Sequence, residues 1–381
     1  MTTVPMSLRY LITGQMANAS RNGFEVIMAS ADGDHLIEAK KIEQVRHKTL
    51  ALKRDISIFS DLKALFQTIR FFLKEKPDIV HTHTPKAGLI GMLAAKLCRV
   101  PLRIHTVAGM PLVGLTGLKR SIVIFTEKLT YWAANHVWPN SYGLMDFILE
   151  NRFTKPAKLK IIGEGSSNGI NLSEFSEESF SEKISEQVKR DIGYSSDYKY
   201  MCFVGRIVSQ KGIVELVSVF KQLQNKYTNW KLLLVGPFEN DRDPVSAECV
   251  NEINSNPDII STGYSDKVKY ILKNADLCVF PSHREGFPNV PLQAGVLKCP
   301  IVCSEIVGNV EVVKHMNTGL LHEAKNELAL YEQLDYAMNN PIKMQELAEN
   351  NYKRIIEKFD RHFVQAEILR TYNKLLNELN K

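Results

Sequence analysis

Two spacings of apolar residues alternate along the first half of the chain. Short apolar runs typical of buried strands occur at 24–29, 78–81, 104–107, 137–139 and 159–162. Between them, 61–74 places Leu62, Leu65, Phe66, Ile69 and Leu73 three or four positions apart, which predicts a helix. Strands that alternate with helices predict a doubly wound parallel sheet.

The start of this sheet is incomplete. A doubly wound sheet normally begins with a full central strand, yet only residues 1–4 precede a helix-like segment at 8–16. The residues leave two explanations open: a start codon assigned too late, or a shortened first strand.

The second half repeats the alternation. Strands are expected at 200–204, 231–235, 259–262, 277–280 and 301–303, and helices at 213–223 and 268–273. After residue 321 the chain is expected to be helical to its end, with a break at 339–341, where two Asn precede a Pro. The polar stretch 163–198 is predicted to be the linker between two domains and the entry to the second.

Composition indicates an ordinary globular protein. The 381 residues are 44% hydrophobic and 24% charged, enough for two or three domains. No apolar run approaches the length of a membrane span, and the start has neither the basic nor the apolar part of a signal peptide, so a cytoplasmic location is expected. The six cysteines are scattered without a CxxC pair, so we expect free thiols and no zinc site.

Charge is unevenly distributed. The net charge is +6, but residues 1–170 hold 23 Lys and Arg against 13 Asp and Glu, a balance of +10. A basic first half fits an anionic partner: a membrane surface, a lipid pyrophosphate or nucleic acid. No nucleic-acid module is recognisable, which favours the first two. A basic surface that is merely solvated remains an alternative.

Two motifs indicate a phosphate site. The stretch HREGFPNVPLQAG (283–295) follows a predicted strand, turns at Gly286 and enters a helix at Pro291, whose N-terminal N–H groups suit a phosphate. In the second, a strand ends at Gly205, and the loop to Gly212 carries Arg206 and Lys211. A single cation in a loop is usually a solvated surface charge. Two cations in one loop directly after a strand favour phosphate binding.

Together the motifs resemble the signature of retaining glycosyltransferases of family 4, which have the GT-B fold: two Rossmann-like doubly wound domains facing across a cleft. The resemblance covers nearly the whole chain and is densest at 81–120, 200–215 and 277–320. It implies an N-terminal acceptor-binding domain, 1–168, joined by a C-terminal helix at about 360–381. The domain implied to bind the nucleotide-sugar spans 169–359.

The resemblance also implies roles for residues at the donor. Glu285 would contact the donor sugar, and Arg206 and Lys211 would hold the diphosphate. A second Glu of the family is Gln293 here, so the ribose would receive a neutral hydrogen bond in place of a charge-assisted one, which implies a weaker or differently tuned site. The residues implied at the donor nucleotide are Gly205, Arg206, Lys211, Gly263, Gly286, Phe287, Asn289, Val290 and Gln293. For Gly263, the implied role is a contact with the nucleotide base, and an ordinary position between a strand and a turn is an equal alternative.

In the first half, HTHTPKAG (81–88) continues the resemblance and places Lys86 near an expected acceptor phosphate. Its two His could be a metal pair, but no third ligand is in frame. The resemblance implies that Ser7, Lys86 and Gly109 lie on the acceptor side. Many family members carry a His directly before Gly109, where this chain has Ala108. His105 is therefore a candidate catalytic residue, with a structural role as the alternative. Ser7 is expected in a loop under the donor phosphates, or as a helix N-cap.

Two further features complete the site expectations. The loop 110–117 and the basic residues 118–120 would suit an undecaprenyl-linked acceptor at a membrane, or pack as an ordinary loop. Asp32-Gly-Asp34 and Asp241-Arg-Asp243 imitate metal-binding DxD motifs but are interpreted as solvated loops. GT-B enzymes need no metal for the diphosphate, so no metal and no cofactor are expected.

The resulting hypothesis is a retaining glycosyltransferase of bacterial surface polysaccharide synthesis, such as lipopolysaccharide or capsule. The expected donor is a UDP-sugar, and the expected acceptor is a glycan or a lipid-pyrophosphate-linked glycan. A peripheral location at the inner face of the cytoplasmic membrane would follow, and no nucleic-acid partner is expected. Two alternatives remain: a catalytically silent partner of a polysaccharide-assembly complex, and a nucleotide-sugar 2-epimerase of the same fold.

Overall fold

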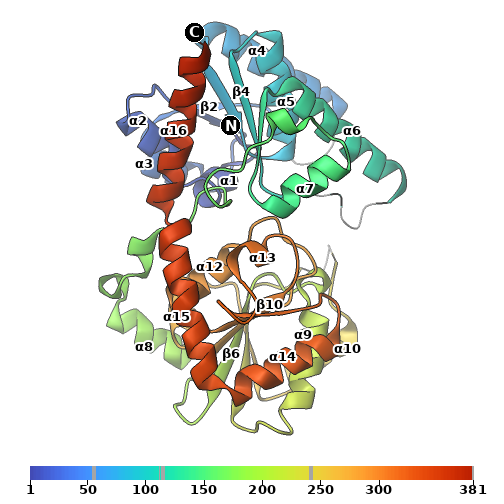
Figure 1. The fold of residues 1–381 in the computed structure, drawn as a ribbon, viewed down its shortest axis with the longest axis vertical. Helices are drawn as coiled ribbons and strands as arrows, with labels where there is room; N and C mark the ends of the chain where they lie inside the picture. The colour runs from blue at the N-terminus through green and yellow to red at the C-terminus, as the bar shows by residue number, and fades with distance from the viewer. Residues whose placement is uncertain (54–56, 111, 113–115, 240–242, 380–381) are drawn as a thin grey trace. The chain divides into compact units, whose positions relative to one another are not determined.

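The computed structural model describes residues 1–53, 57–110, 112, 116–239 and 243–379. The chain divides into two compact units (Figure 1). The first comprises Met1–Gly169 and Arg361–Lys381, and the second comprises Ile170–Asp360. The C-terminal segment therefore belongs to the same unit as the N-terminus.

The first unit is built on short parallel strands. They are β1 (Ile27–Ser30), β2 (Arg46–Thr49), β3 (Ile79–Thr82), β4 (Leu102–Val107) and β5 (His136–Pro139), with β1 paired to β2 and β4 between β3 and β5. Its helices are α1 (Pro5–Tyr10), α2 (Gln15–Arg21), α3 (Leu36–Glu43), α4 (Ile58–Glu75), α5 (Pro85–Leu97), α6 (Gly117–Ala133), α7 (Tyr142–Glu150) and α16 (Arg361–Leu379).

Residues 1–3 join the two groups of strands. The N–H of Thr2 donates to Ala29 of β1 (2.9 Å), and the N–H of His83, just past β3, donates to the carbonyl of Met1 (3.1 Å). Since hydrogen bonds run to both sides, these three residues act as a very short central strand. The Met1 amine is buried, donates to the carbonyl of His81 (2.7 Å), and its pKa is lowered by desolvation from 8.0 to about 5.

Alternation along β4 divides the core of this unit between two helical layers. Ile104 packs with Trp138 of β5 and with Val364 and Ile368 of α16. Val107 faces the other way, into a cluster that includes Met92 of α5. Successive side chains of a strand point to opposite faces, so the direction of each residue follows from its place in the strand.

The second unit has a six-stranded, wholly parallel sheet in the order β11-β10-β9-β6-β7-β8. The strands are β6 (Lys199–Val204), β7 (Trp230–Val235), β8 (Ile259–Gly263), β9 (Leu277–Phe280), β10 (Ile301–Ser304) and β11 (Leu320–His322). The helices are α8 (Glu182–Asp191), α9 (Ile213–Leu223), α10 (Ala247–Ser255), α11 (Val268–Lys273), α12 (Asn289–Val296), α13 (Asn309–Val312), α14 (Glu327–Asn339) and α15 (Pro341–Lys358). Strands β6 and β9 are completely buried apart from the first residue of β6, as expected when helices cover both faces.

Most expected elements are confirmed, two expectations are wrong, and one strand was not predicted. The predicted strand at 159–162 reduces to a single bridge between Leu159 and Val137. The chain is not helical throughout after residue 321, because β11 extends to His322 and a second break separates α15 from α16. The polar strand β2 was not predicted, since its sequence RHKT shows no apolar alternation. The break before Pro341 is confirmed.

Candidate functional site

The strand order of the second unit indicates where a ligand would bind. From β6 the chain proceeds outward through β7 to β8, then returns to the other side of β6 with β9 and continues outward to β11. The order therefore reverses between β6 and β9. In open parallel sheets, ligands bind at the carboxyl ends of strands beside such a switch point. Both sequence motifs follow these two strands.

The loop after β6 begins with a glycine in a special conformation. Gly205 has a φ of 153°, which favours glycine, and its N–H donates to Val235 at the end of β7 (2.9 Å). Arg206 follows at the surface, and its guanidinium lies 2.6 Å from the carboxylate of Glu239. Both side chains are substantially exposed, 45% for Arg206 and 36% for Glu239. The first predicted diphosphate ligand is therefore paired with a carboxylate that sequence reasoning missed.

A short 3₁₀ turn, Ser209–Lys211, holds the second cation. The backbone N–H of Gln210 donates to the Asp243 carboxylate (2.7 Å), and the N–H of Ser209 donates to the Asp243 carbonyl (3.0 Å). The turn ends at Gly212, where φ is 72° and a Cβ would lie 2.2 Å from the Pro281 carbonyl oxygen. Asp243 is exposed, as expected of a solvated loop, but its carboxylate also holds the turn of Lys211. Asp241 and Arg242 lie outside the described residues.

The loop after β9 is tied to this turn by several contacts. The ammonium of Lys211 hydrogen-bonds the carboxylate of Glu285, and both side chains are largely buried, 16% and 15% exposed. The Gln210 side-chain oxygen accepts from Arg284 (2.8 Å), and its backbone carbonyl accepts from the N–H of His283 (2.9 Å). The fold thus brings Lys211 and Glu285 together although 74 positions separate them.

A second pair of side chains links the loop after β9 to helix α9. The imidazole Nε2 of His283 lies 2.8 Å from the carboxylate of Glu215, in the first turn of α9. Neither this pair nor the Gln210 and Asp243 contacts has a local sequence signal, because each depends on the meeting of distant segments.

The remaining residues of the donor motif surround the start of α12. Pro288 precedes the helix, Asn289 is exposed and Val290 half-buried, while Phe287 packs on Phe359 with ring centroids 5.5 Å apart. Gln293 is half-buried in the next turn, and within the described part of the chain its amide makes no hydrogen bond. Pro291 lies in the first helical turn, as predicted. Gly286 belongs to the turn between Glu285 and α12.

Gly263, the glycine expected near the base, ends β8 with a φ of 66°. It forms an isolated bridge with Gly236, and the next residue, Tyr264, is exposed. The strand-to-turn description fits this geometry, and a contact with a base stays a prediction.

The four candidates in the first unit occupy different environments. Ser7 lies inside α1, whose N-cap is Val4, so the expectation of a loop or N-cap position is wrong. Lys86 lies in the first turn of α5, and its ammonium hydrogen-bonds both carboxylate oxygens of Asp61 (2.7 and 2.8 Å). Gly109 follows β4 and is half-buried.

His105 lies in the interior. It is buried, its Nδ1 lies 2.8 Å from the Thr82 hydroxyl, and its ring packs against Gly88 of α5. Desolvation lowers the pKa of His105 from 6.5 to about 3, so the ring is neutral at physiological pH. Strand alternation turns it toward the α5 layer. This placement supports a packing role, and its catalytic role stays a prediction.

The rings of the two His of HTHTPKAG contact each other at a tilt, with centroids 4.0 Å apart. The imidazole of His81 contacts the hydroxyl groups of Tyr372 and Thr106, and desolvation lowers the pKa of both His well below 6.5. In the described part of the chain, no three His, Cys, Asp or Glu side chains gather closely enough to hold a metal ion.

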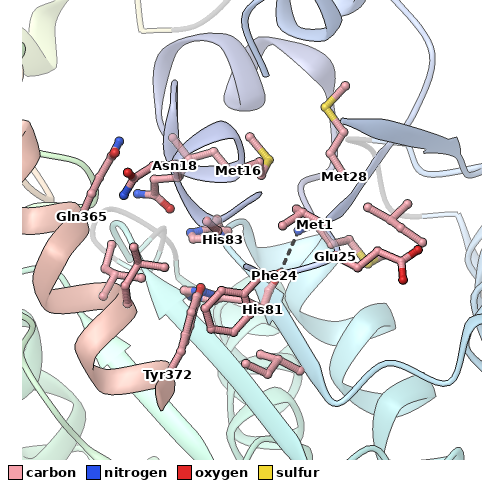
Figure 2. Close-up of a pocket in the computed structure, with 18 residues that line it drawn as sticks. Met1, Met16, Asn18, Phe24, Glu25, Met28, His81, His83, Gln365 and Tyr372 are labelled. Carbon is pink, nitrogen blue, oxygen red and sulfur yellow. Dashed lines mark hydrogen bonds between the residues drawn. The ribbon is translucent and has the colours of Figure 1, made fainter. Parts of the chain in front are cut away.

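A cavity of about 160 Å³ lies beside this pair (Figure 2). It lies next to Met1, and Ile79, His81 and Tyr372 are among its lining residues. Met1, whose carbonyl accepts from the N–H of His83, is itself one of the lining residues. None of the sequence-predicted site residues lines this cavity, so we do not assign the chemistry to it. Among the described residues, no helix has the length and apolar content needed to span a bilayer.

Two family models match the chain. A glycosyl transferase 4-like domain matches residues 12–165, and the glycosyl transferases group 1 model matches residues 184–354. The second match contains the β6 and β9 loops described above.

Similar proteins agree with these matches. The chain is 32% identical to the capsular polysaccharide biosynthesis glycosyltransferase CapM of Staphylococcus aureus, over 97% of this chain and 94% of the relative. It is 28% identical to the UDP-Gal:alpha-D-GlcNAc-diphosphoundecaprenol alpha-1,3-galactosyltransferase of Escherichia coli, over 71% and 69%. The solved structure of Anabaena Alr3699/HepE in complex with UDP and glucose superposes with a TM-score of 0.79 at 16% identity, covering 94% of each chain, which establishes the GT-B fold.

Proposed function

The chain belongs to the family 4 glycosyltransferases of the GT-B fold, and from that premise we propose a UDP-sugar as its donor and a lipid-linked glycan as its acceptor. Its relatives are glycosyltransferases of bacterial capsule and polysaccharide synthesis, which is the class of activity assigned to this chain. The proposal adds the donor nucleotide, the type of acceptor and the roles of individual residues.

The contact between Lys211 and Glu285 carries the proposal. The bond broken in sugar transfer joins C1 of the sugar to an oxygen of the diphosphate. A group that holds the sugar and a cation that holds the phosphate must therefore be neighbours. The second unit meets this requirement at its switch point, where Glu285 contacts Lys211.

In the proposed reaction, the C1–O bond breaks and the nucleoside diphosphate leaves with the electron pair. Lys211 and Arg206 stabilise the negative charge that develops on the departing oxygen. The acceptor hydroxyl attacks C1 from the side of the leaving group, so the configuration is retained, and its proton passes to the leaving phosphate. Glu285 accepts hydrogen bonds from hydroxyls of the donor sugar and fixes its orientation.

The same two cations support the proposal that no metal ion takes part in diphosphate binding. Gln293, one helical turn into α12, is assigned to the ribose as a neutral hydrogen-bonding group. A neutral hydrogen bond contributes about 0.5–1.5 kcal/mol, against about 1.5–3 kcal/mol for a bond to a charged group. The site is therefore expected to bind UDP-sugars more weakly than one with Glu at this position.

The proposed acceptor carries a lipid pyrophosphate, and the protein would meet it at the inner face of the cytoplasmic membrane. The excess of ten positive charges in residues 1–170 supports both partners, since each is anionic. The Escherichia coli relative is named for a diphosphoundecaprenol-linked acceptor.

The test measures release of UDP from a panel of UDP-sugars, with and without undecaprenyl-pyrophosphate-linked glycans. Wild type is compared with Glu285→Ala, Gln293→Glu and Glu332→Ala, the last a matched control at an exposed position of α14. One sugar should be transferred, Glu285→Ala should lower the rate at least about 100-fold, in the range for removal of a positioned polar group, and Glu332→Ala should leave it unchanged.

Other outcomes favour the alternatives. If UDP-sugars bind but none is transferred, the silent partner replaces the enzyme. An epimerised sugar nucleotide without any acceptor product would point to the 2-epimerase. If no UDP-sugar binds, the donor assignment is wrong. A tighter donor complex in Gln293→Glu would measure the effect of the neutral side chain.

A further inference from the structure

Helix α4 exposes an apolar stripe to solvent. Phe59 is 88% exposed and Phe66 69%, and Leu62 and Leu73 are exposed as well. These positions are three, four or seven residues apart and therefore share one side of the helix. The inner side holds a different set, including Ala64 and Phe72. The helix thus has apolar residues on two sides, and only one of them packs against the unit.

Helix α6 shows the same arrangement. Leu118 is 77% exposed and Phe125 65%, and Ile122 and Trp132 extend the stripe along the helix. Its buried side holds Thr130, Tyr131 and Ala133. Leu97, the last residue of α5, is also exposed.

These helices are neighbours, because α5 packs against α4 on one side and against α6 on the other (Figure 1). Among the described residues, 22 large apolar side chains are exposed, and nine of them lie on α4, α5 and α6. Single exposed apolar residues are common on soluble proteins, but a concentration of them marks an interaction surface. We call this surface the α4–α6 face; its apolar members are Phe59, Leu62, Phe66, Leu73, Leu97, Leu118, Ile122, Phe125 and Trp132.

Cations are interleaved with these side chains. The exposed cations are Lys63, Arg70 and Lys74 on α4 and Lys119, Arg120 and Lys128 on α6. On α5, the ammonium of Lys96 lies 4.0 Å from the ring centroid of Trp132.

The carboxylates of the same helices do not balance these charges. Asp61 is engaged by Lys86, and Glu75 is engaged by Arg46 of β2. Glu127 is buried, and desolvation raises the pKa of its carboxyl group. The α4–α6 face is therefore both apolar and positively charged.

We propose that the α4–α6 face docks the protein on the anionic phospholipid surface of a membrane. Aromatic and aliphatic side chains with Lys and Arg between them are the composition of helices that lie in the lipid headgroup region. A second copy of the chain fits less well, because a twofold contact would bring like charges together, and the cores of protein interfaces are depleted of Lys. This inference rests on the proposed function, because a lipid-linked acceptor is embedded in the membrane on which the face would dock.

The test is co-sedimentation of the full chain with vesicles in the absence of any sugar substrate. One set of vesicles is phosphatidylcholine alone, and the other contains about one third phosphatidylglycerol, which supplies the negative surface potential. Wild type should sediment with the anionic vesicles at low salt, bind the neutral vesicles weakly, and dissociate as salt screens the charges.

Two variants examine the apolar and the charged components separately. Phe66→Ser/Phe125→Ser should lose binding to anionic vesicles, and Lys63→Gln/Lys119→Gln should weaken it about 25-fold, at about fivefold for each cation removed. Matched controls on exposed positions of the second unit are Leu328→Ser/Ile342→Ser and Lys183→Gln/Lys353→Gln, and both should bind as wild type does. All substituted residues are exposed, so thermal unfolding should verify that each variant is folded.

Three results would overturn the inference. They are failure of wild type to bind anionic vesicles, equal binding by the face variants and their controls, and a dimer in solution that the Phe66→Ser/Phe125→Ser variant dissociates. The last result would assign the face to a second copy. Sugar transfer to a soluble, lipid-free acceptor separates this inference from the proposed function: if transfer is retained and vesicle binding is absent, only the membrane surface is wrong.

Discussion

At the scale of single residues, both predicted diphosphate ligands are already neutralised by carboxylates. Arg206 contacts Glu239, and Lys211 contacts Glu285. The two pairs differ in exposure: the first is largely exposed, so solvent screens it and its net contribution is small, whereas the second is largely buried. A diphosphate would therefore displace Glu239 from Arg206 easily, while Glu285 would have to turn from Lys211 toward the sugar.

Glu239→Gln is expected to tighten the binding of UDP by about two- to fivefold, the size of an exposed ion pair of up to about 1 kcal/mol. The reason is that Arg206 would no longer be shared with a competing carboxylate. Isothermal titration with UDP measures the change. Arg206→Gln should weaken binding, and Glu332→Gln on α14 should leave it unaltered. An unchanged affinity in Glu239→Gln would mean that the Arg206–Glu239 pair does not compete with the nucleotide.

At the scale of elements, the position of Lys211 depends on a turn that is fixed from outside. Asp243 accepts the Gln210 N–H, and Gln210 in turn contacts both Arg284 and the N–H of His283. The β6 and β9 loops therefore form one hydrogen-bonded group at the switch point. Loss of Asp243 would free the turn without removing any group that contacts a ligand.

Asp243→Ala should weaken UDP binding by up to about tenfold, because one hydrogen bond of about 0.5–1.5 kcal/mol holds the turn in its binding geometry. The melting temperature should change little, since Asp243 is exposed. Asp243→Asn keeps an acceptor oxygen and should retain most of the affinity. Titration of UDP together with thermal unfolding distinguishes this local effect from a general loss of stability; a large fall in melting temperature in Asp243→Ala would contradict it.

The short central strand of the first unit is the second feature at this scale. Met1–Thr3 pair with β1 and β3, and Met1 is one of the residues that line the cavity of Figure 2. An extended apolar segment there would bury its side chains and donate backbone hydrogen bonds to the free edges of β1 and β3.

Extension of the chain ahead of Met1 by three or four β-branched residues is therefore expected to raise the melting temperature. Burial of apolar side chains contributes about 1.5–3 kcal/mol each, reduced by the entropy of ordering the added residues. Differential scanning calorimetry measures the shift. An extension of equal length in Gly and Ser is the control, and it should leave the melting temperature unchanged or lower. An equal rise with both extensions would exclude filling of the cavity as the cause.

At the scale of the whole molecule, the two units should respond differently to acid. Desolvation lowers the pKa of His83 well below 6.5 and that of His105 to about 3, and His81 adds a like charge beside His83. The second unit has one comparable residue, His322, whose pKa is also lowered by burial. Each of these His has a lower pKa in the folded state than in the unfolded state, so the unfolded state binds more protons below pH 6.5. Their stabilising effect is therefore complete above about pH 6.5 and falls as the pH decreases toward the folded pKa.

We expect the first unit to unfold before the second when the pH falls from 7 to 4. Each His that must be protonated on unfolding lowers stability by about 1.4 kcal/mol per pH unit below 6.5. Trp132 and Trp138 report on the first unit and Trp230 on the second, so fluorescence of wild type and Trp230→Phe separates the two transitions. His105→Gln removes one group that gains a proton on unfolding. Between pH 7 and pH 4, the first unit of this variant should therefore lose less stability than the first unit of wild type. Coincident transitions in both proteins would contradict the expectation.

Local patterns in the sequence were sufficient to predict most of the elements and the two loops that meet at the switch point. Apolar periodicity is a local property, so α4 and the strand ending at Val204 follow from the residues alone. Gly205 and Gly212 bracket the loop of Arg206 and Lys211 in the sequence as they do in the structure. Elements without apolar alternation, such as β2, were missed because pairing with β1, and not their own pattern, makes them strands.

Which side chains meet depends on contacts between distant segments, and these are visible only in the folded chain. Periodicity identified the α4 helix but not its inner side, and Leu62, Phe66 and Leu73 of the predicted apolar stripe face solvent. The direction of His105 depends on where β4 begins and on the layer that covers each face. The pairing of Lys211 with Glu285, of Arg206 with Glu239 and of Gln210 with Asp243 joins segments 33 to 74 residues apart. Such contacts arise from the parallel order of β6, β7 and β9, which no local pattern specifies.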